Sequence, residues 1–434
     1  MSSNLNAPAM PQAIAMPAKP PSEAPEAQPS AALLQEREAS ASVERSAWAM
    51  DIAAPAGASG LAFWMPAGVR LRESVMRASL AMHEARGYMQ VKSPSLAPRS
   101  LFELSGHAEK YSSLMFSAQS SSDNGASPLM LRPMSCPNHL SMYAARRRSV
   151  AELPWRVFEF GEVFRDESSG SLAFLLRQRQ FCQDDAHVVC RAEHVAGLAQ
   201  GWLAMAREAC EWMGCGEPVL RLASRPPSRM GSDESWDASE SMLAAELDAS
   251  GSSWDWAPGD GAFYGPKIEL GVREPSGKLW QMGVFQLDMN LPGRFGLSAD
   301  GLPAGESLVL VHHAVFGSIE RAIGVMLACR GLNLPPASHP RALAILAVSD
   351  KLLPEASRFA AEARAIIGGR AELLSGGDPL GVKIAKAKAG GWLRIAVVGG
   401  KEAEMAQLMG RAFAAVDRKA VDAAQACEGL LAKR

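Results

Sequence analysis

A polar segment in the middle of the chain constrains its folding most. Residues 158–190 read FEFGEVFRDESSGSLAFLLRQRQFCQDDAHVVC. Apolar and polar residues alternate at both ends of the segment, which is the period of a β-strand, and the glycine-containing middle is typical of a long hairpin loop. The segment therefore predicts two antiparallel strands joined by a polar loop.

The predicted hairpin carries many polar groups on one face. They are Arg165, Glu167, Arg177, Gln183, Asp185 and His187. Such a face is either an exposed sheet edge or the wall of a polar cleft. The residue pattern by itself favours the exposed edge, because polar faces are usually solvated, and the cleft wall stays open as the alternative.

The residues FRDE and RQRQF resemble motif 2 of the class II aminoacyl-tRNA synthetases. The resemblance implies that Arg165 binds the α-phosphate of ATP, that Glu167 recognises the adenine amino group and that Phe181 stacks on the base. Arg177 matches the second arginine of the motif. A guanidinium suits phosphate because it offers two parallel donors in a fixed geometry.

Six segments in a fixed order extend the resemblance to the threonyl-tRNA synthetase family over residues 61–400. They are LRPMSCPNH, the hairpin, QDDAH, GAFYGPKIEL, LWQMGVFQLDMNLPGR and VHHAVFGSIERAIG. The order makes this signal far more specific than any one motif. It implies an α+β catalytic domain, with an antiparallel sheet and flanking helices, followed by a small α/β anticodon-binding domain. It also implies a homodimer formed through the helix and strand within residues 66–94.

Composition and the positions of proline-rich segments predict three parts of the chain. Residues 1–47 are rich in Pro and Ala and are expected to be disordered, although Leu33 to Trp48 contains a helix-compatible piece. Residues 48–332 are expected to form the catalytic domain. The Pro-rich segment Gly331–Pro340 is a linker, and residues 341–434 alternate strand and helix in the way of a small parallel α/β domain.

Three residues match the zinc ligands of the resembled family, namely Cys136, His187 and His312. Their spacing indicates no metal by itself, since lone histidines are more often hydrogen-bonded core or surface groups. The resemblance implies one Zn²⁺ per chain with an open fourth position for threonine. Asp185 is expected to accept the threonine hydroxyl, so valine is rejected while serine is activated.

Further positions are assigned by the resemblance alone. Arg321 is expected to hold the γ-phosphate, and Lys267 and Gln281 to lie on the nucleotide or substrate side. The remaining substrate positions are Met134, Gln183, Tyr264 and Gln286, for two of which, Met134 and Tyr264, core packing is an equal alternative. No general base is needed, because the substrate carboxylate attacks the α-phosphorus while arginines and Mg²⁺ neutralise charge.

The chain also departs from the family pattern. Asn138 replaces a Gly and His313 replaces an Arg beside the ligand positions, so His313 is a candidate competing ligand. Ala347, Asp378 and the segment MAQLMG replace polar residues of the anticodon face, which predicts weak anticodon dependence. Residues 340–434 carry a net charge of +5 and the rest −7, which fits a phosphate-rich partner or an ordinary solvated surface.

The predicted function is ATP-dependent activation of L-threonine and transfer to tRNA(Thr). No editing domain is expected before the catalytic one. The alternative is a paralogue that passes threonine or a relative to a carrier-protein thiol; a non-enzymatic regulator is disfavoured because the ATP and zinc positions are intact. Seven cysteines without a CxxC pair, no long apolar run and no signal sequence predict a cytoplasmic protein with no membrane segment.

Overall fold

The structure is a computed structural model that describes residues 41–47, 49–55, 57–119 and 129–399. Most of the predicted disordered tail lies outside these residues. The last part of that predicted tail, residues 41–47, is helical, and Val43 and Ala47 are fully buried in the main core. Their spacing of four residues places both side chains on one helix face, so the predicted tail included residues that belong to the folded domain.

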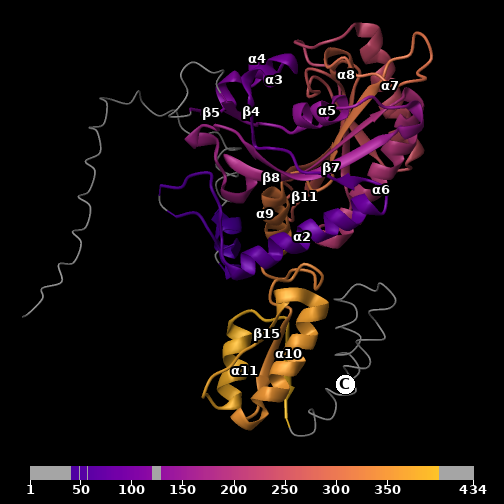
Figure 1. The fold of residues 1–434 in the computed structure, drawn as a ribbon. Coiled ribbons are helices and arrows are strands. Elements are labelled where there is room, and N and C mark those ends of the chain that lie inside the picture. Colours follow the sequence, from indigo (N-terminus) through magenta and orange to yellow (C-terminus); the bar gives the residue numbers. More distant parts are fainter. Residues whose placement is uncertain (1–40, 48, 56, 120–128, 400–434) are drawn as a thin grey trace, which may run out of the picture.

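An eight-stranded sheet forms the centre of the larger unit (Figure 1). From edge to edge its strands are β10 (Trp254–Ala257), β9 (Val219–Ala223), β11 (Lys267–Arg273), β12 (Leu279–Asp288), β13 (Val309–Ala314), β8 (Gln180–Cys190), β7 (Trp155–Phe164) and β3 (Met89–Gln90). All pairs from β9 to β7 are antiparallel, and only the two edge pairs are parallel. The predicted antiparallel α+β sheet is confirmed.

The predicted hairpin is the pair β7 and β8, which align over their full lengths. β8 lies between β13 and β7, so it is an interior strand, and the exposed-edge alternative is wrong. Its residues alternate strictly: Asp184 and Ala186 lie on one face, and Gln183, Asp185 and His187 lie on the other. The polar face is therefore the wall of a site.

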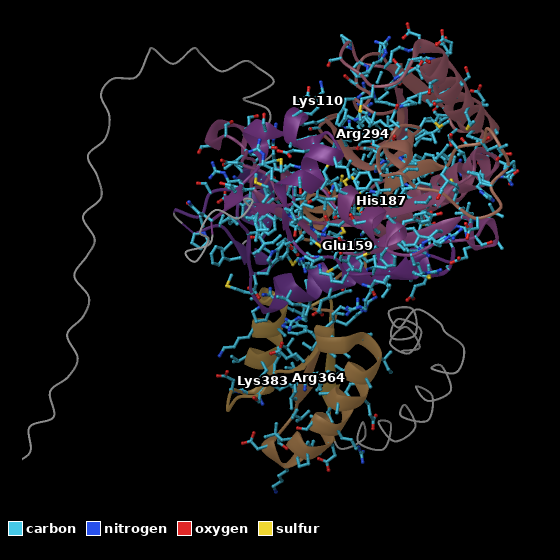
Figure 2. The ribbon with its side chains drawn as sticks, turned by 45° about the horizontal axis from the view of Figure 1, so that its top comes forward. Lys110, Glu159, His187, Arg294, Arg364 and Lys383 are labelled. Carbon is cyan, nitrogen blue, oxygen red and sulfur yellow. The ribbon has the colours of Figure 1, made fainter. Side chains whose placement is uncertain are left out.

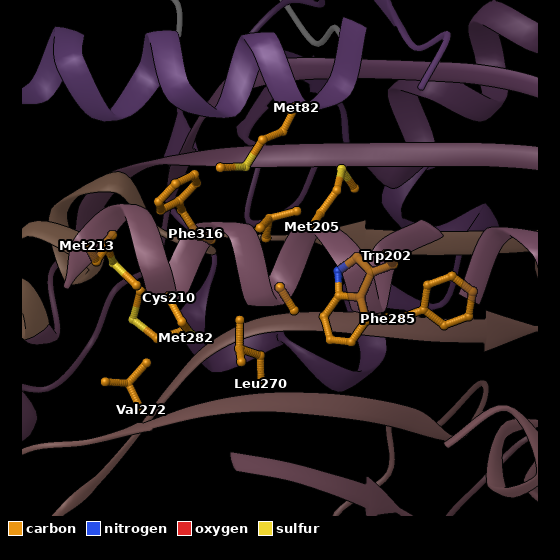
Figure 3. Packing of buried hydrophobic residues seen from close by; sticks show 14 of the residues in the cluster. Met82, Trp202, Met205, Cys210, Met213, Leu270, Val272, Met282, Phe285 and Phe316 are labelled. Carbon is orange, nitrogen blue, oxygen red and sulfur yellow. The ribbon is translucent and has the colours of Figure 1, made fainter. Parts of the chain in front are cut away.

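Helices cover both faces of the sheet. On the core face lie α2 (Pro66–Glu84), α6 (Val195–Met213), α7 (Asp233–Ala249) and α9 (Ile319–Arg330). Figure 3 shows Trp202 of α6 beside Phe285 of β12 in this core, and the indole of Trp202 donates to the carbonyl of Ala314 at 3.0 Å. On the site face lie α3 (Arg99–Leu104), α4 (His107–Lys110), α5 (Cys136–Ala144) and α8 (Leu291–Arg294) (Figure 1).

Two small sheets complete the larger unit. β1 (Ile52–Ala53) pairs with β2 (Phe63–Trp64), and β6 (Leu129–Leu131) lies between β4 (Leu96–Pro98) and β5 (Ser117–Ala118). None of the helices in the described part of the chain is both long and apolar enough to cross a membrane.

A smaller unit follows at the end of the described chain, with its own core (Figure 1). Its three strands are parallel in the order β15 (Ala371–Leu373), β14 (Leu343–Ala347), β16 (Arg394–Val398), and its helices are α10 (Leu353–Ile367) and α11 (Leu380–Ala389). Parallel pairing agrees with the strand and helix alternation in the sequence. Arg341 pairs with Asp51 at 3.1 Å and thereby ties this unit to the start of the larger one. The last part of the predicted α/β domain, residues 400–434, lies outside the described residues.

Candidate active site and metal-ligand triad

A row of polar side chains crosses the site face of the sheet. Lys267 of β11 pairs in register with Gln286 of β12, Gln286 with His312 of β13, and His312 with His187 of β8. Residues directly opposite one another in antiparallel strands point to the same face. Three consecutive strands and the distant strand β8 thus place four predicted site residues in one line.

Cys136 completes a compact triad with the two histidines of this row. It is the first residue of α5, whose Pro137 suits a helix start. The Sγ of Cys136 and one ring nitrogen from each of His187 and His312 lie within 4.8 Å of one another, and all three residues are buried. His187 lies deep in the larger unit (Figure 2). One sulfur and two nitrogens in this arrangement form a donor set suited to a transition metal, with room for a fourth ligand.

Residues that surround the triad orient both of its histidines, His187 and His312. Asp288 accepts a hydrogen bond from Nε2 of His312 at 3.1 Å, which leaves Nδ1 of His312 facing the triad. The other carboxylate oxygen of Asp288 accepts the backbone N–H groups of Asn290 and Leu291. On the other side, His139 lies 2.8 Å from Nδ1 of His187. Carboxylate and imidazole partners of this kind fix the tautomer of a metal-binding histidine.

A buried ion pair supports these surrounding residues. Arg132 and Glu159 are both fully buried and pair at 2.5 Å, and Glu159 lies 3.5 Å from Nε2 of His139. Hydrogen bonds and charges from these partners hold the pKa of Glu159 at about 2 despite its burial. Glu159 therefore stays ionised and keeps His139 oriented toward His187.

Protonation states in the triad suit a cation. Burial lowers the pKa of His187 well below its ordinary value, so its ring is neutral and free to coordinate. Burial also raises the pKa of the Cys136 thiol well above its ordinary value. A thiolate at this position needs a nearby positive charge, which a bound divalent metal would provide. The residues present therefore fit a metal ion.

Asp185 lies beside the triad, with its Oδ1 atom 3.9 Å from Nδ1 of His187. Burial raises the pKa of its carboxyl group, and its Oδ2 atom has no hydrogen-bond partner among the described residues. An unpartnered buried acceptor is costly unless a ligand satisfies it. Tyr264 lies nearby and is buried, with its ring centroid 5.1 Å from that of His312. Gln183 and Asp185 share one face of β8.

Three arginines converge beside the motif 2 hairpin. The guanidinium of Arg165 lies 5.2 Å from the ring centroid of Phe181, and Arg177 pairs with Glu167 at 2.9 Å. Burial lowers the pKa of Arg321, and the positive charges of Arg165 and Arg177 lower it further. The charge of Glu167 raises the pKa of Arg321. Converging cations with one carboxylate between them form a site for a polyanion such as triphosphate.

Lys267 and Gln281 meet at a shared carboxylate. Lys267 pairs with Glu269 at 2.8 Å, and the amide of Gln281 donates to the same oxygen at 2.9 Å. A cavity of about 340 Å³ opens beside these residues and is also lined by Arg221 and Asp260. Gln286 donates to the carbonyl of Gly265 at 3.1 Å. Met134 is half-buried two residues before Cys136.

Asp184 anchors the turn that leads into α9. It accepts the backbone N–H groups of Val315, Phe316 and Gly317, and the hydroxyl of Ser79 in α2. Burial raises the pKa of Asp184 to about 7, while these hydrogen bonds act in the opposite direction. Gly317 has φ 72° and leaves no room for a side chain, because an added Cβ would lie 2.4 Å from the carbonyl of Met282.

We expect Asp184→Ala to lower the free energy of unfolding by about 3 kcal/mol or more, because three buried backbone N–H groups would lose their acceptor. Urea denaturation of the full chain measures the change. The matched control is Asp300→Ala, since Asp300 forms an exposed pair with Arg147 and should contribute under about 1 kcal/mol. Equal stabilities of the two variants would contradict the anchoring role.

His313 is not a competing ligand. It follows His312 in β13, so its side chain points to the opposite, core face of the sheet. There its ring stacks on His83 at 5.4 Å and meets the edge of Tyr88 at 4.9 Å. Asn138, the other departure, donates to the carbonyl of Pro94 at 2.9 Å and so fixes the start of α5.

The sequence did not single out His139, Glu159, Asp184 or Asp288. Asp288 lies two residues after the predicted pocket residue Gln286, and His139 lies one helical turn after Cys136. These spacings place Asp288 and His139 on the site side of their elements, so spacing was the sequence signal that could have identified them.

Comparisons with known proteins point to one enzyme family. The family model described as "tRNA synthetase class II core domain (G, H, P, S and T)" matches residues 116–330. The threonine–tRNA ligase of Maricaulis maris is 37% identical over 351 residues, which cover 80% of this chain and 54% of the relative. That of Herminiimonas arsenicoxydans is 38% identical over 294 residues, covering 68% of this chain and 46% of the relative. The chain thus spans about half the length of the curated relatives it matches.

Solved structures share the fold over most of the chain. A prolyl-tRNA synthetase of Giardia lamblia shares the fold alone, at 16% identity and a TM-score of 0.61. The RNA binding domain of threonyl-tRNA synthetase from Cryptosporidium parvum Iowa II is 31% identical with a TM-score of 0.76, and the match covers 85% of this chain and 90% of that one. With the core-domain match and the identities above, this chain belongs to the threonyl-tRNA synthetases, a family of class II aminoacyl-tRNA synthetases.

Proposed function

We propose that this protein activates L-threonine with ATP and transfers the threonyl group to tRNA(Thr). The observation that carries the proposal is the triad of Cys136, His187 and His312, set beside the unpartnered carboxylate oxygen of Asp185. A small amino acid with both an amino and a hydroxyl group matches this combination of a metal position and a hydrogen-bond acceptor. Zn²⁺ in the triad would supply a Lewis-acidic position for those two groups.

The other side of the site suits the nucleotide. Arg165, Arg177 and Arg321 gather positive charge where a triphosphate and its Mg²⁺ would lie, and Glu167 offers an acceptor for the adenine amino group. We expect the threonine carboxylate to attack the α-phosphorus, with pyrophosphate as the leaving group. The protein then contributes alignment and charge neutralisation rather than a general base.

The protein is also proposed to be a homodimer. Of the twelve large apolar side chains that are exposed in the described residues, six lie within residues 61–96, namely Leu61, Phe63, Met65, Val69, Met89 and Leu96. Exposed apolar side chains gathered in one region are typical of a contact surface. A second copy of this chain fits the surface best, since the helix and strand that the family resemblance assigns to the dimer, within residues 66–94, lie in this stretch and contribute Val69 and Met89.

The smaller unit is proposed to contact tRNA with little reading of the anticodon. Ala347 is buried in β14 and offers no polar side chain, and Asp378 is paired with Lys386 at 2.6 Å. Binding that rests on backbone phosphates is sensitive to salt and tolerant of sequence. We therefore expect charging of tRNA(Thr) to fall steeply with ionic strength and to change little when the anticodon is altered.

The acceptor is tested by incubating the full chain with ATP, radiolabelled threonine and total tRNA, and in parallel with carrier proteins that bear a thiol arm. We expect label on tRNA. Label on a carrier protein and none on tRNA would replace the ligase proposal by the carrier-protein alternative. Threonine-dependent ATP–pyrophosphate exchange, measured without any acceptor, separates a failure of activation from a wrong acceptor.

Amino-acid selectivity follows from Asp185. We expect serine to be activated measurably and valine hardly at all, because valine lacks the hydroxyl that the free oxygen of Asp185 accepts. Serine lacks only a methyl group, which is worth about 1 to 3 kcal/mol. Pyrophosphate exchange with each amino acid measures the difference, and valine exchange equal to serine exchange would contradict this account.

A further inference from the structure

We propose that Glu320 is a positioning residue for the nucleotide site, because its carboxylate holds the helix that carries Arg321 against the strand that carries Phe181. Both of these residues are expected to contact ATP, so the inference rests on the proposed function. It adds the group that fixes how the two sides of the nucleotide site lie relative to each other.

Glu320 closes an edge of β8 that has no strand beside it. The pairing of β13 with β8 stops at Ala186, so the backbone N–H groups that point to this edge before Ala186 need other acceptors. Asp184 donates its N–H to the carbonyl of Gly317 at 3.2 Å, and Cys182 donates its N–H to the carboxylate of Glu320 at 2.9 Å. The carboxylate thus takes the place of a strand partner where β13 has ended.

The same carboxylate oxygen also fixes the start of α9. The hydroxyl of Ser318 donates to it at 3.1 Å, and this hydroxyl in turn accepts the backbone N–H of Arg321 at 3.0 Å. Arg321 directly follows Glu320, and Phe181 directly precedes Cys182. One oxygen therefore lies between two elements at the points where each presents a residue to the nucleotide.

A circuit of contacts holds the carboxylate from its other side. Nε of Arg72 in α2 lies 3.6 Å from the second oxygen of Glu320, and the guanidinium of Arg72 also donates to Glu162 of β7 at 2.9 Å. Glu162 pairs in register with Cys182. The four elements α2, β7, β8 and α9, which lie together in Figure 1, are thus joined through side chains as well as through packing.

The carboxylate of Glu320 is out of reach of water, with only 5% of its side chain exposed. Burial raises its pKa to about 7, whereas the N–H of Cys182 and the charge of Arg72 lower it. Without this acceptor the N–H of Cys182 would be buried and unpaired, which is unfavourable. We expect α9 to shift along β8 in response, which would change the separation of Arg321 and Phe181.

The test compares Glu320→Ala with the unaltered full chain. Calorimetric titration with ATP and Mg²⁺, without an amino acid, gives the Kd for ATP, and pyrophosphate exchange gives the KM values for ATP and threonine. We expect the Kd and the KM for ATP to rise at least about tenfold, since a misplacement of about 1 Å can cost up to about 100-fold.

The threonine side of the site should not respond. The KM for threonine and the zinc content should stay within about twofold, because the pairing of β8 with β13 holds His187 opposite His312 without Glu320. General unfolding would instead lower the active fraction of the protein and leave the KM for ATP unchanged. The two KM values therefore separate a positioning role from a loss of stability.

Glu320→Gln is the conservative variant and should bring the Kd for ATP back to within about threefold of the unaltered value, because its amide oxygen can still accept from Cys182. Arg72→Met should raise the Kd by itself but add under about twofold in the Glu320→Ala chain, since both changes act through one carboxylate. Glu274→Ala is the matched control. Glu274 is a buried carboxylate that accepts from the indole of Trp280 at 2.8 Å, and its loss should leave the Kd within about twofold.

Two results would overturn the positioning role. One is a Kd for ATP in Glu320→Ala within about twofold of the unaltered value, and the other is an equal rise in the KM values for ATP and threonine. An unaltered chain that binds ATP but shows no threonine-dependent exchange would refute the proposed function alone. An unaltered chain that binds no ATP would refute both.

Discussion

Replacing Arg321 with alanine is expected to reduce threonine-dependent ATP–pyrophosphate exchange at least about 100-fold, the scale seen when a preorganised charge contact to a transition state is removed. The side chain is held in place before any nucleotide binds. Its Nε donates to the carbonyl of Leu176 at 2.9 Å, and its backbone N–H donates to the N-cap hydroxyl of Ser318. The guanidinium therefore reaches the nucleotide site with little reorganisation.

The matched control for this variant is Arg77→Ala. Arg77 also lies on a helix of the larger unit, but its side chain is 55% exposed, and its partners among the described residues, Glu73 and Ser74, belong to the same helix. It should leave the exchange rate within about twofold, because exposed helix pairs contribute a few tenths of a kcal/mol. An exchange rate near that of the unaltered chain in Arg321→Ala would mean that the triphosphate lies elsewhere.

Replacing Cys136 with alanine is expected to abolish metal binding, with zinc falling from about one atom per chain to near zero in elemental analysis. Two histidines remain in the variant, but zinc in proteins is almost always held by three or four protein ligands, so His187 and His312 alone should not retain it. Threonine-dependent exchange should fall in parallel. Dialysis of the unaltered chain against a strong chelator should give the same loss. Added zinc should restore the activity of the dialysed unaltered chain but not that of Cys136→Ala.

Cys182→Ala is the control for this experiment. Cys182 is also buried, and it lies on β8 with its side chain on the core face, away from the triad. Its removal should leave the zinc content unchanged. Zinc retained in Cys136→Ala, or an unaltered chain that purifies with no zinc and binds none on titration, would refute the proposed metal site.

Local sequence patterns predicted much of the fold. Alternation at period two predicted β7 and β8, and the helix expected within residues 66–94 is α2, which runs from Pro66 to Glu84. The parallel pairing of the smaller unit followed from its alternating strands and helices. In contrast, the four-residue strand β10 was not predicted, because WDWA is too short to show a period.

The same alternation was sufficient to predict that His313 points away from the face of His312, since neighbouring residues in a strand face opposite sides. Cys136 and Pro137 also indicated the start of the helix α5, although the sequence pattern identified these residues only as part of a motif. In both cases the local signal was present in the sequence.

The sequence by itself determined the elements, the family resemblance and the chemical types at the site. Only the tertiary structure decided that β8 is an interior strand and that His187 lies opposite His312, 125 residues away. It also supplied the partners of the site, from Asp288 at His312 to Glu159 at His139. Periodicity records which face of an element is apolar, and this preference is local. Strand order and register depend instead on contacts between distant segments, whose free energy no short stretch of sequence expresses.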